Sequence, residues 1–146
     1  MISSPPPLIA LLDDEAQMLT ALGRLLRSQG FAVAAFQTGE ALLAAEEGNE
    51  FHCIIMDLHM PGLDGFDMLK ALSTRPVHPP VIIITGHDEA GNCERVKALG
   101  ACAYLLKPVP AAPLLGAILR SRTETFAGSP PAVLNDGSIS DLLVSV

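Results

Sequence analysis

Five short apolar runs divide the chain as far as residue 121, and a segment of helical character follows each one. The runs are LIALL (8–12), FAVAAF (31–36), HCIIMD (52–57), PVIIIT (80–85) and CAYLLK (102–107). Continuous runs of this length are typical of strands that are covered on both faces. Strict alternation of strands and helices predicts a parallel sheet with right-handed crossovers and helices on both sides. We therefore expect a doubly wound α/β domain.

The helical segments differ in the strength of their signals. They are residues 15–30, 38–45, 65–73, 88–100 and 113–121. In the first, Met and Leu recur at helical spacing, and Gly30 can cap the end. Thr38 can cap the start of the second. The fourth is polar and weakly patterned, which fits an element that can move.

A length of 146 residues indicates one domain. We predict an extended Pro-rich lead-in over residues 1–7, a folded domain over 8–121 and a linker-like tail over 122–146. The tail contains Gly, Ser, Pro and Asn without helical period, and it lacks the paired helices of a helix-turn-helix. The sequence leaves open whether the chain stands alone or is the front part of a longer protein.

Composition excludes several functional classes. A net charge of −7 repels nucleic acid phosphates, so we expect no direct binding of DNA or RNA. No apolar run is long enough for a membrane helix, and the N-terminus lacks the basic region of a secretory signal, so we expect a cytoplasmic location. Cys53, Cys93 and Cys102 form no CxxC pair. We interpret Cys53 and Cys102 as small buried hydrophobes in a reducing compartment, rather than as metal ligands or a disulfide.

Polar residues stand at the carboxyl ends of four of the five predicted strands. They are Asp13, Asp14, Asp57, Thr85 and Lys107, and Gly86 and Pro108 directly follow the last two. The second strand, which ends at Phe36 and Gln37, contributes no charge. Ligands of open parallel sheets bind beyond this edge, near the point where the strand order reverses. We therefore expect three carboxylates, one hydroxyl and one amine to converge there.

This set of groups has a specific chemistry. Three neighbouring carboxylates repel one another, and a divalent cation relieves the repulsion. Mg²⁺, or Mn²⁺ in its place, suits such a site because it leaves positions for water and phosphate oxygens. One carboxylate can then attack a phosphoryl donor and form an aspartyl phosphate. Lys107 offers a charge to the phosphoryl oxygens, Thr85 a hydroxyl, and Gly86 a backbone without a Cβ.

The motifs LLDDE, IIMDLHMPGLDG, VIIITG and GACAYLLKP occur in this order at the predicted strand ends. Together with the fivefold strand–helix order, they resemble the receiver domain of bacterial two-component response regulators, over roughly residues 8–121. The resemblance implies a flavodoxin-like (βα)5 fold with strand order 2-1-3-4-5. It also implies a signalling switch rather than an enzyme, although such domains catalyse their own Mg²⁺-dependent dephosphorylation.

The resemblance assigns roles to the acidic residues. Asp57 corresponds to the aspartate that accepts a phosphoryl group from a sensor histidine kinase or a histidine phosphotransfer protein. Asp13, Asp14 and Asp57 correspond to the Mg²⁺ ligands, with the backbone carbonyl of His59 as a further ligand.

The resemblance also assigns the residues that bind the phosphoryl group and switch. Thr85 corresponds to the switch hydroxyl, and Gly86 and Lys107 to groups around the phosphoryl oxygens. Tyr104 corresponds to an aromatic residue that turns inward when the threonine moves toward the phosphoryl group. Pro108 corresponds to a proline that follows a cis peptide bond.

Two features depart from the family pattern or add to it. Val109 and Pro110 follow the Lys-Pro pair, where many receivers have Phe. This changes the start of the last helix, and with it the face used for output or for homodimerisation. The sequence leaves open whether the chain forms a homodimer through that helix. His59 and His87 flank the expected phosphoryl position, and we hypothesise that they set the lifetime of the phosphorylated form.

Plainer alternatives exist for several residues and for the function. Asp57 could be a turn former, and Tyr104 could simply pack in the core. A scaffold receiver that binds partners without phosphorylation is opposed by the intact acids, Thr85 and Lys107. A phosphohydrolase that forms an aspartyl phosphate typically has a second Asp where His59 stands. A dinucleotide-binding protein is opposed by the absence of GxGxxG after the first strand.

Overall fold

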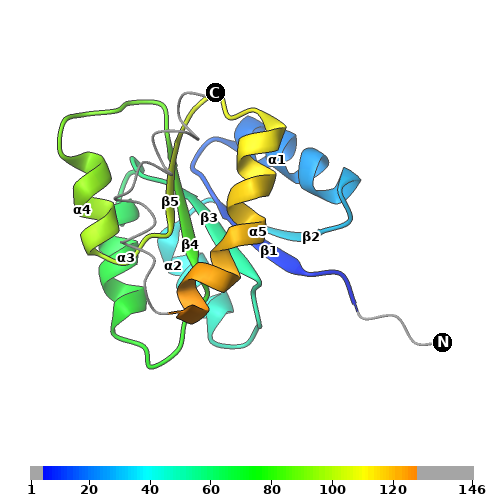
Figure 1. The fold of residues 1–146 in the computed structure, drawn as a ribbon, viewed down its shortest axis with the longest axis horizontal. Helices are drawn as coiled ribbons and strands as arrows, with labels where there is room; N and C mark the ends of the chain where they lie inside the picture. The colour runs from blue at the N-terminus through cyan, green and yellow to red at the C-terminus, as the bar shows by residue number, and fades with distance from the viewer. Residues whose placement is uncertain (1–4, 128–146) are drawn as a thin grey trace.

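A five-stranded parallel sheet forms the centre of the molecule, and its strand order is the one expected (Figure 1). The structure is a computed structural model that describes residues 5–127, with side chains described as far as residue 121. The strands are β1 (Leu8–Leu12), β2 (Ala32–Phe36), β3 (Cys53–Asp57), β4 (Val81–Thr85) and β5 (Ala103–Leu106). They lie in the order β2-β1-β3-β4-β5, so the strand order reverses between β1 and β3.

Helices cover both faces of the sheet (Figure 1). They are α1 (Ala16–Ser28), α2 (Gly39–Glu46), α3 (Gly65–Ser73), α4 (Asn92–Ala98) and α5 (Ala111–Ala127). One core cluster contains buried residues of α1 and α5, and the other contains buried residues of α2, α3 and α4. Strand residues alternate between the clusters: Ile54 and Met56 of β3 belong to the second, and Cys53 and Ile55 to the first. The predicted doubly wound α/β architecture is therefore confirmed.

The ends of the helices mostly follow the predicted signals. The Thr38 hydroxyl accepts the Ala41 N–H at 3.2 Å and caps α2, and Gly30 follows α1 with φ at +93°. Helix α4 begins later than predicted, because Gly91 with φ at +88° separates it from the preceding loop.

The prediction that the last helix ends near residue 121 was wrong, because α5 continues to Ala127. After Gly116, the next glycine or proline is Gly128, so no residue that breaks a helix interrupts the segment. The predicted linker from residue 128 onward lies outside the described residues.

Cys53, Cys93 and Cys102 are not joined in disulfides, and Cys53 and Cys102 are buried as predicted. Burial raises the pKa of the Cys53 thiol. Within residues 5–127, the structure contains no helix of the length and apolar character that crossing a membrane requires.

Candidate functional site

The carboxyl ends of β1, β3, β4 and β5 bring the predicted site residues to one edge of the sheet. Asp13 directly follows β1, and Asp57 is the last residue of β3, which pairs with β1. Thr85 is the last residue of β4, and Lys107 directly follows β5. The Lys107 N–H donates to the Thr85 carbonyl at 2.8 Å, which fixes the two strand ends side by side.

Three carboxylates gather at this edge. Asp13, Asp14 and Asp57 each offer an oxygen, and these oxygens lie within 4.8 Å of one another. Asp13 is 1% exposed and Asp57 is 6% exposed, whereas Asp14 is exposed. Like charges held this close and partly out of water are costly to ionise without a counter-charge.

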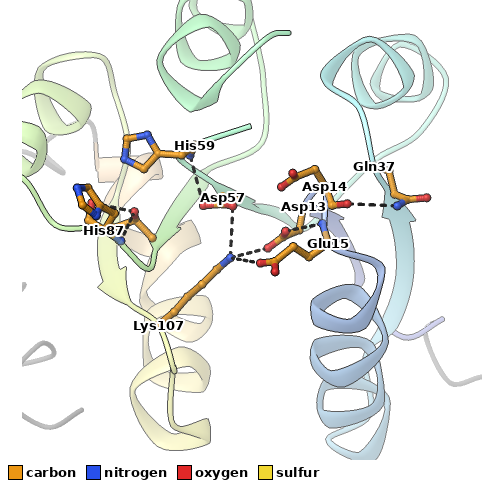
Figure 2. A network of polar contacts seen from close by, with 9 residues as sticks. Asp13, Asp14, Glu15, Gln37, Asp57, His59, His87 and Lys107 are labelled. Carbon is orange, nitrogen blue, oxygen red and sulfur yellow. Dashed lines mark hydrogen bonds and ion pairs between the residues drawn. The ribbon is translucent and has the colours of Figure 1, made fainter. Parts of the chain in front are cut away.

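Lys107 supplies part of that counter-charge (Figure 2). Its Nζ lies 2.8 Å from Asp13 Oδ2, 3.3 Å from Asp57 Oδ2 and 3.7 Å from Glu15 Oε1. The Asp13 Oδ1 atom also accepts the Glu15 N–H at 2.9 Å, so Asp13 holds both the start of α1 and the ammonium. One ammonium faces several carboxylates, and the site keeps an excess of negative charge.

The pKa values at the site follow this balance. Burial raises the pKa of Asp57 and the Asp13 charge raises it further, although Lys107 and the His59 N–H, 3.3 Å from Asp57 Oδ1, act to lower it. Burial lowers the pKa of Lys107, but its bond to Asp13 and the charges of Asp57 and Asp13 outweigh burial and raise it overall. Oxygen donors with excess negative charge fit a hard divalent cation such as Mg²⁺.

The loop after Asp57 is tightly held behind the carboxylate. The Leu58 N–H donates to the Ile84 carbonyl at 2.9 Å, and the Gly65 N–H donates to the Leu58 carbonyl at 2.8 Å. A Cβ on Gly65 would lie 2.9 Å from the Leu58 Cα and 3.2 Å from the Asp57 carbonyl oxygen. Only glycine therefore fits at the start of α3, where the chain returns against the end of β3.

The Thr85 hydroxyl is engaged by its own loop. Its oxygen accepts the His87 N–H at 3.1 Å and donates to the His87 carbonyl at 3.2 Å. The rings of His59 and His87 lie 6.0 Å apart, on the side of Asp57 opposite the acid pair (Figure 2). A Cβ on Gly86 would meet only the Lys107 side chain at 3.8 Å, an ordinary contact, so within the protein nothing requires glycine there.

Tyr104 is fully buried, and its hydroxyl donates to Asp88 Oδ1 at 2.7 Å. The resemblance associates an inward aromatic with a threonine that has moved, yet here Tyr104 is inward while the Thr85 hydroxyl contacts His87. The peptide bond between Lys107 and Pro108 is cis.

Two residues of the site were missed or assigned elsewhere from the sequence. Asp88 was treated only as part of a polar segment, and no local pattern connects it with Tyr104. Glu15 directly precedes α1, and its approach to Lys107 depends on how β5 and α1 meet in space, which the sequence pattern does not contain.

Comparisons with known proteins agree with this geometry. The family model described as the response regulator receiver domain matches residues 9–119. The transcriptional regulatory protein FixJ of Bradyrhizobium diazoefficiens is 39% identical over 100 residues, which cover 68% of this chain and 49% of that protein. FixJ of Azorhizobium caulinodans is 34% identical over 113 residues, covering 77% and 54% respectively. The chain therefore spans about half the length of these curated relatives.

Solved structures show the same architecture. Full-length FixJ from B. japonicum superposes with a TM-score of 0.76 at 34% identity, covering 83% of this chain and 60% of that one. The chemotaxis protein CheY4 of Vibrio cholerae superposes with a TM-score of 0.73 at 25% identity, covering 80% and 98%. By its fold, its matched profile and its relatives, the chain belongs to the receiver domain family of two-component response regulators.

Proposed function

We propose that this receiver domain is a phosphorylation switch in which Asp57 accepts a phosphoryl group from the histidine of a sensor kinase or of a phosphotransfer protein. The observation that carries the proposal is the setting of Asp57. It is a nearly buried carboxylate at a strand end, close to two further carboxylates and 3.3 Å from an ammonium. A residue that only shaped a turn would need none of these neighbours.

The transfer needs little covalent chemistry from the protein. A carboxylate oxygen of Asp57 attacks the phosphorus of a phosphohistidine. The new P–O bond forms as the P–N bond breaks, and the imidazole leaves with the electron pair. Lys107 already reaches Asp57 and would follow the negative charge onto the phosphoryl oxygens. Thr85 would exchange its bonds to His87 for one to the phosphoryl group.

Asp13, Asp14 and Asp57 would hold Mg²⁺, or Mn²⁺, with the backbone carbonyl of His59 as a further ligand. The fit rests on the all-oxygen donor set and on the negative charge that Lys107 leaves uncompensated. When bound, the ion supplies charge neutralisation at the transferring phosphoryl group.

The added charge would shift the domain between two arrangements in which Thr85 and Tyr104 take part. His59 and His87 stand where they would control water access to the phosphoryl group, and thereby the rate of Mg²⁺-dependent self-dephosphorylation. We place this cycle in the cytoplasm. Its output passes to a partner, to a second copy through the last helix, or to an output domain that this chain does not include.

Beryllofluoride, which mimics a phosphoryl group on a carboxylate, tests the proposal. With Mg²⁺ present, fluorine NMR should show a bound species for the parent chain and none for Asp57→Asn. A folded parent chain that binds no beryllofluoride would favour the alternative of a scaffold receiver that works without phosphorylation.

A further inference from the structure

Two neighbouring residues of the loop after β4, His87 and Asp88, bind the side chains of the two switch residues, Thr85 and Tyr104. The backbone of His87 holds the Thr85 hydroxyl through two hydrogen bonds, 3.1 and 3.2 Å long. The next residue, Asp88, holds the Tyr104 hydroxyl through its carboxylate at 2.7 Å. The inward position of Tyr104 therefore has its own support, and this support does not depend on the Thr85 hydroxyl having left the loop.

The bond between Tyr104 and Asp88 is of a strong kind. Hydrogen bonds from a hydroxyl to a carboxylate are short and about twice as strong as neutral ones, and 2.7 Å lies at the limit of that range. Asp88 itself is exposed, so its carboxylate keeps contact with water and costs little to hold there. The Tyr104 side chain is fully buried, so loss of the Asp88 carboxylate would remove the strong acceptor that fixes the position of its hydroxyl.

The surroundings of Tyr104 connect this bond with α4. The ring belongs to the core cluster that also contains Ile83 of β4 and Val96 of α4. Burial raises the pKa of Tyr104, and the hydrogen bond and charge of Asp88 raise it further. Asp88 stands four residues before α4 begins at Asn92, and the Asn92 side chain also interacts with the Tyr104 hydroxyl and acts to lower its pKa.

We propose that Asp88 is a positioning residue of the switch: its carboxylate keeps Tyr104 in the core and so biases the domain toward the inward arrangement. A move of Thr85 toward Asp57 would break its hydrogen bonds to His87 and shift the adjoining Asp88. The Thr85–His87 and Tyr104–Asp88 interactions would therefore be coupled. The positioning of Tyr104 stands on geometry alone, whereas its effect on the phosphoryl site rests on the proposed function.

The sequence provides a probe for this inference. The chain has one tyrosine and no tryptophan, so its tyrosine fluorescence reports Tyr104 alone. Quenching by acrylamide measures how far the ring is accessible to solvent. In the full chain without ligand, we expect quenching to rise several-fold in Asp88→Ala, and by less in Asp88→Asn, which retains a neutral acceptor. Glu89→Ala removes a neighbouring exposed acid and is the matched control, with quenching as in the parent chain.

Quenching of both Asp88 variants at the level of the parent chain would overturn the proposal, as would an equal rise in Glu89→Ala. Circular dichroism and a urea unfolding curve identify a variant that fails to fold. If Asp88→Ala does so, the comparison between Asp88→Asn and Glu89→Ala decides.

A second arm separates this inference from the proposed function. A hydrogen bond to a charged group is worth roughly ten- to a hundredfold in an equilibrium constant, and the lower end applies here because Asp88 is exposed to solvent. The affinity for beryllofluoride with Mg²⁺ should therefore fall by up to about tenfold in Asp88→Ala, and saturation should restore the parent quenching. An exposed Tyr104 with unchanged affinity would overturn the coupling between the two sites. No binding by any variant, including the parent chain, would count against the proposed function and leave the ligand-free comparison intact.

Discussion

Lys107 Nζ donates to Asp13 Oδ2 at 2.8 Å, although the two residues are 94 positions apart in the chain. The same ammonium lies 3.3 Å from Asp57 Oδ2, so one cation joins carboxylates from β1 and β3. Asp13 is almost fully buried and the Lys107 side chain is 11% exposed, so water screens the attraction between their charges only weakly. The pair is therefore central to both the stability of the site and its charge.

Lys107→Met keeps most of the side-chain length and removes the charge. Breaking a buried ion pair leaves an uncompensated carboxylate, so we expect a loss of about 2–4 kcal/mol in the free energy of unfolding near neutral pH. Urea denaturation measures this loss. Lys70→Met, on the exposed face of α3, is the control and should change stability by less than about 0.5 kcal/mol. Equal stability of the two variants would show that the ion pair contributes nothing.

Asp57→Asn should stabilise the fold near neutral pH in the presence of a chelator. The pKa of Asp57 is raised above the ordinary value of 3.8, chiefly by burial, so the folded state binds this proton more tightly than the unfolded chain does. The contribution of Asp57 to stability therefore falls as the pH rises from 3.8 through the raised pKa. Asn does not titrate and does not repel Asp13.

The pH dependence separates this effect from other consequences of the substitution. Well below pH 3.8, Asp57 is protonated in both the folded and the unfolded chain, so the extra stability of Asp57→Asn should disappear. Urea unfolding curves of both chains across this range provide the test. A variant that is less stable than the parent chain near neutral pH would contradict the assigned direction of the pKa.

Gly65→Ala should disturb the loop that supports Asp57. The added Cβ would lie 2.9 Å from the Leu58 Cα and 3.2 Å from the Asp57 carbonyl oxygen, and backbone cannot move aside as a flexible side chain can. Overpacking of this kind costs roughly 1–3 kcal/mol. Gly48→Ala is the matched control, because a Cβ there meets nothing within 4 Å. Equal stability of the two variants in thermal unfolding would contradict this expectation.

The strand ends and their acids were predictable, whereas their side-chain contacts were not. Parallel strands end at a common edge, so Asp13 and Asp57 could be placed together from apolar runs alone. The hydrogen bond between Tyr104 and Asp88, and that between Thr85 and His87, depend on the conformation of one loop. Periodicity contains no information about such a loop, because its polar residues form no repeating pattern.

Element boundaries show the same limit. The start of α3 at Gly65 follows from local chemistry, since Asp64 and Asp67 form a reciprocal capping box there. The end of α5 could not be placed in this way, because the segment after residue 121 has no helical period and yet no residue that stops a helix before Gly128.

The double substitution of His59 and His87 by Ala should shorten the lifetime of the phosphorylated chain several-fold. The two rings lie 6.0 Å apart on one side of Asp57, and under the hypothesis they would restrict the approach of water to the phosphoryl group. Decay of the phosphorylated form, followed by intact mass after removal of the donor, measures the lifetime. His78→Ala changes a histidine in the loop before β4 and should leave the rate unaltered. An unchanged rate in the double variant would refute the hypothesis.

The most direct test of the central claim is the intact mass of the chain after incubation with Mg²⁺ and acetyl phosphate, with Asp57→Asn treated in parallel. We predict the mass of one added phosphoryl group on the parent chain and none on the variant, since the proposed acceptor, Asp57, lies beside Lys107 and the acid pair. An adduct of equal yield on Asp57→Asn would contradict the account. So would a folded parent chain that gains no phosphoryl group and forms no complex with beryllofluoride.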